Sequence, residues 1–252
     1  MNHYILTILA ILAVIKNSTS DLNQKDKHVD RVAVEREYSQ QNLTRYPVIL
    51  VPGDGGNQLW SKLNKTVAPH YFCQLKSKDY FLLWLNLEDV PPYSIDCFVD
   101  NIRLVYDNQT KKSLNSPGVD VKIKDFGQTA SVEYIDDDRY SVTAYFGPIV
   151  DNLVKKLNYK RGLNVMGAPY DWRKAPDELD EFYQNFTKLI EDTYYVNNGT
   201  RVMIIAHSMG NPVTLYFLNN YVTQEWKDKF IKIFVSLSGV WGGAVKTLSN
   251  DT

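Results

Sequence analysis

Short apolar runs bounded by turn-forming residues predict strands at several places in the chain. Residues 46–51 are apolar and end at the glycine-rich segment 52–56, which predicts a buried strand followed by a turn. Apolar and polar residues alternate within 119–123 and again within 231–237. Alternation with a period of two is typical of a strand that has one more exposed face.

Two longer segments carry apolar side chains at the spacing of an amphipathic helix. They are residues 149–157 and residues 179–190, and the second follows Pro176-Asp177-Glu178, a typical helix start. Strands that alternate with helices of this length favour βαβ units. The sequence therefore predicts an α/β fold with a mostly parallel sheet that helices cover on both faces.

The segment 202–218 contains the most specific chemical pattern of the chain. An apolar run, 202–206, ends in His207-Ser208-Met209-Gly210, and a second apolar run follows. This is the pattern of a nucleophile elbow, in which a strand, a sharp turn and a helix N-terminus expose a serine hydroxyl. We predict that Ser208 is a catalytic nucleophile and that the Met209 N–H stabilises an oxyanion. A strand-to-helix turn without catalysis is the alternative.

A glycine-rich loop follows the first predicted strand, where this kind of fold places an oxyanion loop. The loop reads Val51-Pro-Gly-Asp-Gly-Gly-Asn-Gln58. Because glycines let backbone amides approach a ligand, we expect an amide near Asp54 to join that of Met209. A phosphate-binding P-loop would end in Lys-Ser/Thr, which is absent here. An ordinary glycine-rich turn is the remaining alternative.

The two cysteines, Cys73 and Cys97, flank an aromatic and aliphatic run at 80–85. In an oxidising compartment we expect one disulfide between them, and two free buried thiols are the alternative. The run fits either an ordinary buried strand or helix, or a lid or membrane-docking lobe around residues 73–97. In the second case the side chains that contact lipid would be Phe81, Leu82, Trp84 and Leu85.

The N-terminal residues 1–20 resemble a secretory signal peptide, with an apolar block at 4–15 and small residues Ser18 and Ser20 after it. The block is short for a membrane span, and a non-cleaved anchor is the alternative. A polar segment, 21–45, precedes the predicted domain, 46–252. Asn-x-Ser/Thr sequences agree with entry into the secretory pathway and are candidate glycosylation sites at Asn42, Asn64, Asn108, Asn185, Asn198 and Asn250.

Composition narrows the classes of function further. The chain has 252 residues, of which 44% are hydrophobic and 23% charged, so it can bury one substantial core. Its formal net charge of -1 gives no basic footprint, and nucleic acid is therefore not an expected partner. The acidic triplet 136–138 lacks the spacing of a calcium-binding EF-hand and is expected to be a solvated turn. We expect no metal and no other cofactor.

Several longer motifs indicate a family relationship. In chain order they are VPGDGGNQL at 51–59, YFLLWLNLE at 80–88, DCFVDNIRLVYD at 96–107, GAPYDWRKAP at 167–176, AHSMGNPVTLYFL at 206–218 and WKDKFIKIFVSL at 226–237. Together these motifs resemble the lecithin:cholesterol acyltransferase family, and within it the lysosomal phospholipases A2.

The resemblance implies an α/β-hydrolase fold with a lid and a membrane-binding lobe. It also implies an enzyme that transfers acyl groups from glycerophospholipids to water or to a lipid alcohol, with a phospholipid membrane surface as its peripheral partner. By position, Ser208 corresponds to the family's nucleophile, and Asp54 and Met209 correspond to the residues of its oxyanion amides. Cys73 and Cys97 correspond to its first disulfide. Lys246 corresponds to a lysine near its cleft. The family motif Asp171-Trp-Arg173 is interpreted as structural, because a buried Asp–Arg pair beside an indole can hold a loop under the cleft.

The chain departs from the family after the elbow. An acid and then a histidine normally follow the nucleophile in this type of fold, but no histidine follows Ser208. His28 and His70 precede the nucleophile, and His207 adjoins it in a turn where neighbouring side chains point apart. We expect the family's Asp and His to lie beyond Thr252, an unpaired sheet edge at 231–237, and little activity from this chain alone.

The leading hypothesis is therefore a phospholipase A and O-acyltransferase that forms an acyl-enzyme on a serine. A non-catalytic lipid-binding protein and a soluble serine esterase are the alternatives. The protein is expected to enter the secretory pathway. Its final destination is then either the lysosome or the extracellular space.

Overall fold

A four-stranded parallel sheet organises the chain. The computed structural model describes residues 45–86, 94–136 and 143–244, and residues from Pro47 onward belong to one compact unit. The strand order in the sheet is β7-β1-β8-β9, and all three pairings are parallel. The strands are β7 (Val165–Gly167), β1 (Val48–Val51), β8 (Val202–His207) and β9 (Ile231–Leu237).

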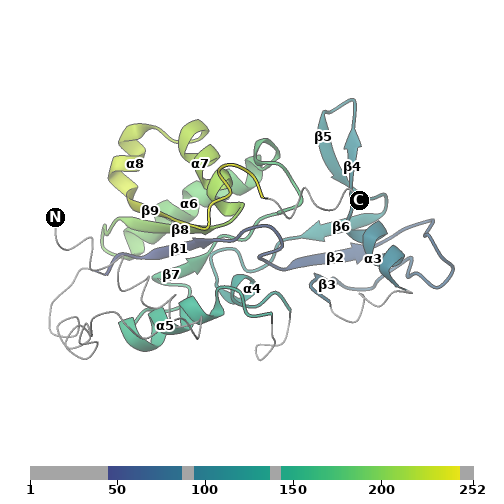
Figure 1. Cartoon of the computed structure of the whole chain (residues 1–252), viewed down its shortest axis with the longest axis horizontal. Helices are drawn as coiled ribbons and strands as arrows, with labels where there is room; N and C mark the ends of the chain where they lie inside the picture. The colour runs from purple at the N-terminus through teal and green to yellow at the C-terminus, as the bar shows by residue number, and fades with distance from the viewer. Residues whose placement is uncertain (1–44, 87–93, 137–142, 245–252) are drawn as a thin grey trace, which may run out of the picture. The chain divides into compact units, whose positions relative to one another are not determined.

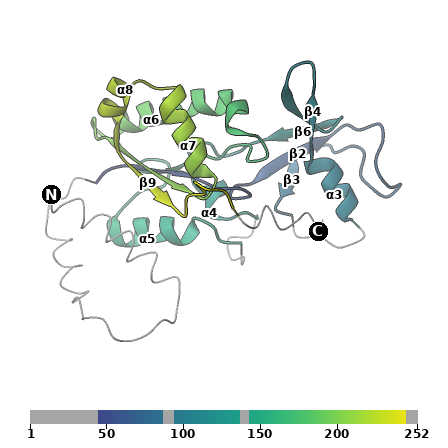
Figure 2. The same ribbon diagram turned by 45° about the horizontal axis from the view of Figure 1, so that its top comes forward.

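Helices cover both faces of this sheet, as the sequence predicts (Figures 1 and 2). On one face lie α4 (Ala130–Glu133) and α5 (Gly147–Leu157). On the other face lie α6 (Asp180–Val196), which follows a short 3-10 turn at Pro176–Glu178, α7 (Gly210–Asn220) and α8 (Gln224–Phe230). The two helices predicted from periodicity are thus confirmed, and α6 continues beyond the predicted end at residue 190.

The main core lies between the sheet and the helices α6, α7 and α8. Strand β1 is buried along its whole length, because its residues are apolar on both faces and both faces are covered. Phe186 and Phe217 are fully buried against this layer, with their ring centroids 4.9 Å apart. Burial of one such ring contributes on the order of 2–3 kcal/mol to the free energy of folding. The core therefore holds β8, and the residues at its carboxyl end, in a fixed position.

A second group of elements, which we call the lobe, spans the described residues between 59 and 122. Its three-stranded antiparallel sheet has the order β3-β2-β6. The lobe consists of β2 (Leu59–Leu63), β3 (Phe81–Trp84), α3 (Ile95–Ile102), the hairpin of β4 (Leu104–Asp107) and β5 (Lys112–Asn115), and β6 (Val119–Lys122). The strand predicted at 119–123 is confirmed, and the apolar run 80–85 forms β3.

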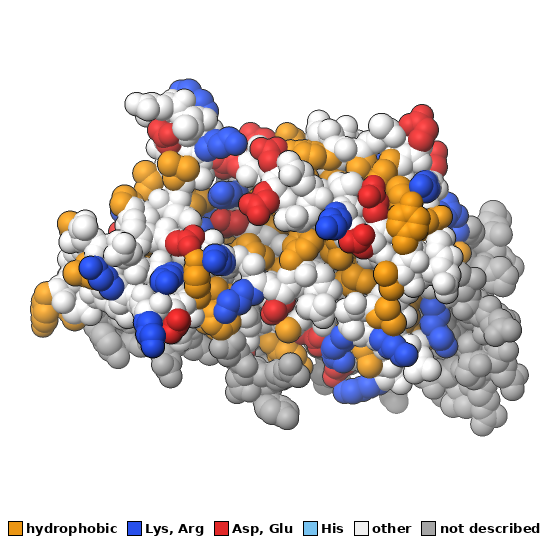
Figure 3. All heavy atoms as spheres, turned by 180° about the vertical axis from the view of Figure 1, so that it is seen from behind, with side chains coloured by type: hydrophobic (Ala, Val, Ile, Leu, Met, Phe, Trp, Pro, Cys, Tyr) orange, Lys and Arg blue, Asp and Glu red, His pale blue; other side chains and the backbone are white. Residues whose placement is uncertain are grey.

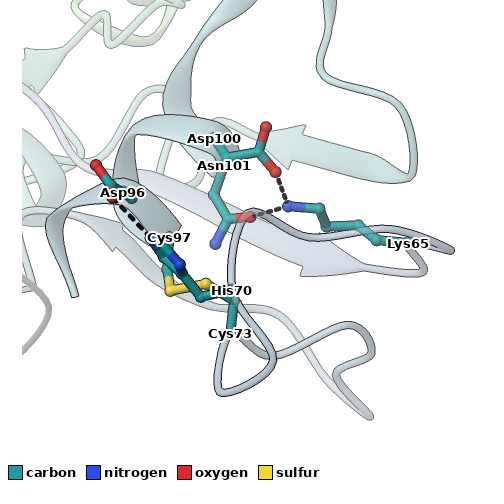
Figure 4. Close-up of a disulfide and its surroundings, with 7 residues drawn as sticks. All are labelled: Lys65, His70, Cys73, Asp96, Cys97, Asp100 and Asn101. Carbon is teal, nitrogen blue, oxygen red and sulfur yellow. Dashed lines mark hydrogen bonds and ion pairs between the residues drawn. A yellow bond between two sulfur atoms is a disulfide. The ribbon is translucent and has the colours of Figure 1, made fainter. Parts of the chain in front are cut away.

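A disulfide and a buried ion pair fix α3 within the lobe (Figure 4). Cys73 and Cys97 are bonded, with their Cα atoms 5.5 Å apart, so the predicted disulfide is confirmed. The buried Lys65 ammonium contacts the Asp100 carboxylate and donates a hydrogen bond of 2.9 Å to Asn101 Oδ1. Both links join the segment after β2 to α3.

Within the described residues, none of the helices is both long and apolar enough to cross a membrane. The predicted signal peptide lies outside the described residues, as do Asn42, Lys246 and Asn250.

Candidate active site

Ser208 occupies the sharp turn between β8 and α7. Its backbone has φ 51°, the left-handed conformation that a nucleophile elbow requires of its serine. The Ser208 N–H donates to Leu237 O at 3.0 Å, and its side chain is half-buried. The turn also needs a small residue behind the serine, since a Cβ on Gly210 would lie 2.4 Å from Pro52 O. The predicted elbow is therefore present, and Ser208 is not among the fully buried residues.

The glycine-rich loop after β1 lies directly against this turn. A Cβ on Gly53 would meet Ser208 Cβ at 2.7 Å, so only glycine allows the loop to approach so closely. The Gly56 N–H donates to Gly53 O at 3.0 Å and closes a tight turn around Asp54. Partial burial raises the pKa of the Asp54 carboxyl, and a hydrogen bond from the Gly55 N–H lowers it in part.

Two backbone N–H groups at this junction form no hydrogen bond with the described part of the protein. Neither the Asp54 N–H nor the Met209 N–H has an acceptor among the described residues. Met209 is the N-cap of α7, where the first N–H groups of a helix have no partner within the helix. These are the two amides that the sequence predicts for an oxyanion hole, and the structure brings both loops that carry them to Ser208.

Tyr145, which the sequence does not single out, connects the glycine-rich loop to β8. Its hydroxyl accepts a hydrogen bond from the Gly53 N–H at 3.0 Å and also contacts His207 Nδ1. Burial raises the pKa of Tyr145 to about 12, and burial lowers the pKa of His207. The tyrosine therefore stays protonated and the imidazole tends to stay neutral at ordinary pH.

Trp84 contacts the same loop at Gly55. Its indole N–H donates to Gly55 O at 2.8 Å, and its ring packs on Trp172 with a centroid distance of 5.2 Å. Trp84 is half-buried, and its indole N–H finds its acceptor in the candidate site; its contact with lipid stays a prediction. The strand that carries Trp84 is fixed as well, since its neighbour Leu83 is buried.

Phe81, Leu82 and Leu85 are each half-buried, and their role in lipid binding stays a prediction. More strongly exposed apolar side chains lie elsewhere in the lobe, around the disulfide. Tyr71 is fully exposed and Phe72 is half-exposed, and both directly precede Cys73. The other exposed apolar residues of this region are Val67, Leu75, Ile95 and Val99. On the left side of Figure 3, which belongs to the lobe, hydrophobic side chains lie among lysines and arginines.

The motif Asp171-Trp-Arg173 joins the lobe to the core. The buried Arg173 guanidinium contacts the Asp171 carboxylate at 2.8 Å, and it also donates to Ile102 O and Asn115 Oδ1 in the lobe. The Trp172 indole N–H donates to the backbone carbonyl oxygen of the buried Asn57, at the end of the glycine-rich loop. The structural interpretation of this motif is therefore confirmed.

Within the described residues, no histidine or carboxylate forms a hydrogen bond with the Ser208 hydroxyl. His207 Nδ1 faces Tyr145, and His70 Nε2 contacts the Asp96 carboxylate at 2.7 Å in the lobe (Figure 4). His28 lies outside the described residues. The prediction that His70 and His207 are poor substitutes for a catalytic base agrees with these contacts.

The remaining predicted sites lie on the surface or outside the described residues. The candidate glycosylation sites Asn64, Asn108, Asn185 and Asn198 are all exposed, and their modification stays a prediction. Across the ranges that the structure describes, no cluster of His, Cys, Asp and Glu could hold a metal ion. A shallow depression of about 370 Å³ is lined by Tyr134, Ala144 and one side of α5, and Ser208 does not belong to it.

Comparison with known proteins gives a consistent result. Residues 80–250 match the family described as Lecithin:cholesterol acyltransferase. The human protein "Lysosomal phospholipase A and acyltransferase" is 50% identical over 203 residues, which cover 80% of this chain and 48% of the human protein. A chicken "Phosphatidylcholine-sterol acyltransferase" is 45% identical over 202 residues, with the same coverage of 80% and 48%.

The chain spans about half the length of the curated relatives it matches. The matches confirm the resemblance that the motifs indicate. Together with the parallel sheet, its helices and the disulfide, they also confirm the predicted α/β-hydrolase fold.

Proposed function

Because the chain belongs to the lecithin:cholesterol acyltransferase family, we propose that it carries the nucleophile and the oxyanion hole of a phospholipase A and O-acyltransferase. One observation carries this proposal. Ser208, at positive φ and half-buried, lies where the loop of Asp54 meets the start of α7, and both loops offer a backbone donor without an acceptor among the described residues.

The proposed reaction follows from these groups. The Ser208 hydroxyl adds to the ester carbonyl carbon of a glycerophospholipid and gives its proton to a general base. The carbonyl oxygen becomes an oxyanion, which accepts hydrogen bonds from the N–H groups of Asp54 and Met209. The C–O bond to glycerol then breaks, the glycerol oxygen takes the proton, and the acyl group stays on Ser208. Water or a lipid alcohol next adds to the acyl carbonyl carbon and gives its proton to the base. The bond from this carbon to Ser208 Oγ then breaks, Oγ takes the proton back, and the fatty acid or the acylated alcohol leaves.

The general base is a separate part of the proposal. His70 and His207, the two described histidines, are engaged with Asp96 and Tyr145. We therefore propose that the base is a histidine supplied from outside the described residues, oriented by an acid, as the family resemblance implies. Without it, the oxyanion hole and substrate binding give only a small part of the rate.

A test of the nucleophile compares Ser208→Ala with Ser238→Ala in the protein at its natural length. Ser238 is a matched control, because it is exposed and also has a positive φ, 45°. The measurements are covalent labelling by a fluorophosphonate and release of fatty acid from phosphatidylcholine vesicles. Ser208→Ala should abolish labelling and reduce the rate by at least about 10⁴-fold, whereas Ser238→Ala keeps both.

Labelling that survives in Ser208→Ala would remove this serine from its role. Vesicle binding by a wild-type protein that neither labels nor hydrolyses would favour the lipid-binding protein. Hydrolysis of small soluble esters without vesicle binding would favour the soluble esterase.

We also propose that the exposed apolar side chains near the disulfide contact the phospholipid surface. Tyr71 and Phe72 follow each other at the surface, and the disulfide of the next residue anchors them to α3. A rigid support lowers the entropic cost of inserting aromatic side chains into an interface. The phospholipid membrane is then the peripheral partner of the protein, and a lipid alcohol within it is the acyl acceptor.

A double substitution, Tyr71→Ser with Phe72→Ser, tests the surface. Each aromatic ring is worth on the order of 1–2 kcal/mol of buried apolar area, so vesicle association should weaken at least about tenfold. The control is Tyr195→Ser with Val196→Ser, because both residues are exposed at the end of α6. Equal loss in the two double variants, measured by vesicle cosedimentation, would contradict a specific role for the lobe.

The location belongs to the proposal as well. A disulfide that closes within one domain forms and persists in oxidising compartments, and the exposed Asn-x-Ser/Thr sites are accessible to glycosylation. We therefore propose a protein of the secretory pathway that acts in the lysosome or outside the cell.

A further inference from the structure

We infer that Tyr145 is a positioning residue of the acylation site, which fixes the oxyanion loop and the tautomer of His207 through one hydroxyl group. This inference rests on the proposed function and adds a residue to it. Tyr145 lies just before α5, far in sequence from the two segments that it connects.

The first part of the argument concerns the loop. The Gly53 N–H is bound to the Tyr145 hydroxyl, and the Gly53 carbonyl accepts from the Gly56 N–H. The peptide groups on both sides of Gly53 are thus held in place, and the second of them carries the Asp54 N–H. The phenol ring itself supports the loop, because a Cβ on Gly56 would lie 2.8 Å from the Tyr145 ring carbon Cζ. With the Gly53 amide occupied, Asp54 supplies the next amide for an oxyanion.

The second part of the argument concerns the single proton of the tyrosine hydroxyl. The oxygen of Tyr145 accepts from the Gly53 N–H, and its proton needs an acceptor of its own. His207 Nδ1 is in contact with that oxygen and can accept if the imidazole carries its proton on Nε2. Only this arrangement gives both the Gly53 N–H and the Tyr145 O–H an acceptor within the trio. We therefore assign neutral His207 with a free Nδ1 lone pair directed at Tyr145.

The arrangement has a chemical consequence for Ser208. A neutral histidine whose Nδ1 is occupied does not compete for the Ser208 proton, although it is the adjacent residue. It also leaves the hydrogen bond to Tyr145 unchanged during acylation, so the loop does not need to reorganise when the oxyanion forms. Tyr145 acts through the backbone of the loop and does not touch the reacting atoms.

The experiment compares Tyr145→Phe with Tyr195→Phe in the protein at its natural length. Tyr195 is a matched tyrosine whose exposed hydroxyl contacts only the Lys229 ammonium among the described residues. The rate of Ser208 modification by fluorophosphonate should fall roughly tenfold in Tyr145→Phe, less than for direct loss of an oxyanion donor. KM for vesicle phospholipid should change less than twofold, because the effect concerns the transition state. Tyr195→Phe should match the wild type in both.

Imidazole ¹⁵N resonances supply a second readout that needs no activity. In the wild type, His207 Nδ1 should show the resonance of an unprotonated, hydrogen-bonded nitrogen, and Tyr145→Phe should convert it to a mixture of tautomers. A further pair, His207→Gln and His207→Leu, tests the acceptor: glutamine retains an oxygen for the Tyr145 proton and should lose less labelling rate than leucine.

Several results would overturn the inference. One is labelling of Tyr145→Phe at the wild-type rate. If Ser208→Ala is not labelled in the same experiment, the proposed function stands and only the role of Tyr145 is lost. Another is an identical His207 tautomer in the wild type and Tyr145→Phe. If the wild type is not labelled at all, the proposed function fails, and the nitrogen resonances still decide the contact.

Discussion

Ser208 holds a backbone conformation that costs a residue with a side chain about 1–2 kcal/mol. The surrounding structure compensates for that cost at several points. Its N–H donates to Leu237 O, and the Asn211 side chain donates to Ser208 O at 2.9 Å and to Leu237 O at 3.1 Å. The two bonds to Leu237 O join the turn and the start of α7 to β9, so the position of the hydroxyl depends on the neighbouring strand as well as on its own loop.

Gly210 offers a direct test of this packing. A methyl group there would lie 2.4 Å from Pro52 O and 2.7 Å from Val51 O, both backbone atoms that cannot move aside cheaply. We expect Gly210→Ala to lower the free energy of unfolding by about 2 kcal/mol, within the range of overpacked cores, and to slow labelling of Ser208. Urea denaturation measures the first effect.

Gly242→Ala is the control for this change, because nothing lies within 4 Å of the added methyl group. A Gly210→Ala protein as stable as the Gly242→Ala protein would show that the elbow tolerates a side chain behind the serine.

At the scale of single residues, the local motif predicts Ser208, Asp54 and Met209 because a nucleophile elbow and its loop are short, contiguous patterns. Tyr145 could not be predicted, because its contacts are with residues that are distant in the sequence. Its two contacts reach residues 92 and 62 positions away, and nothing in its own segment marks it. For Trp84, the aromatic run alone does not reveal that the indole N–H finds its acceptor in the glycine-rich loop.

At the scale of elements, periodicity predicts what is long or clearly alternating. The helices α5 and α6 and the strands β1, β6, β8 and β9 all correspond to such patterns. Strand β7 has only three residues, too few for any period to appear, and it is defined by its pairing with β1. The short hairpin of β4 and β5 is likewise fixed by neighbours and by Lys111 at φ 57° in its turn.

Arg173 shows how one side chain joins elements. Its guanidinium has partners in α3, in β5 and in its own loop, and a lysine ammonium cannot reach all of them. Because the group is buried, we expect Arg173→Lys to lower the free energy of unfolding by about 3 kcal/mol, as measured by urea denaturation.

Arg103→Lys is the matched control, because Arg103 pairs with Asp100 on the surface and its side chain is 50% exposed. Loss of an exposed pair costs about 1 kcal/mol or less. Equal destabilisation by the two changes would mean that the contacts of Arg173 are worth no more than a surface ion pair.

At the scale of the whole molecule, the arrangement of lobe and core could not be predicted from the sequence. The sequence predicts one disulfide and a structural Asp–Arg pair, and both are confirmed. It does not predict that Arg173, Trp172 and Trp84 together join the lobe to the core beside the candidate site. These contacts arise between segments far apart in the chain, and no short pattern encodes them.

The stability of the molecule should depend on acidity in a specific direction. Burial lowers the pKa of His207, so below about pH 6.5 the unfolded chain takes up a proton there more readily than the folded protein. Stability is therefore full above that pH and falls as the pH decreases towards the lowered pKa. Hydrogen bonds lower the pKa values of Asp107 and Asp151, so a further loss follows below about pH 4.

Urea denaturation at pH 7, 6 and 5 measures this dependence. His207→Gln should flatten the decline between pH 7 and pH 5, because the titrating group is gone. A slope equal to that of the wild type would assign the acid sensitivity in this interval to other groups.

The hydrogen bond from Trp84 to Gly55 O also limits how the protein can be re-engineered. A lobe grafted from a homologue that lacks this tryptophan would leave the Gly55 carbonyl without its indole donor. Chimeras between family members should therefore exchange β3 together with the glycine-rich loop, because each segment depends on the other.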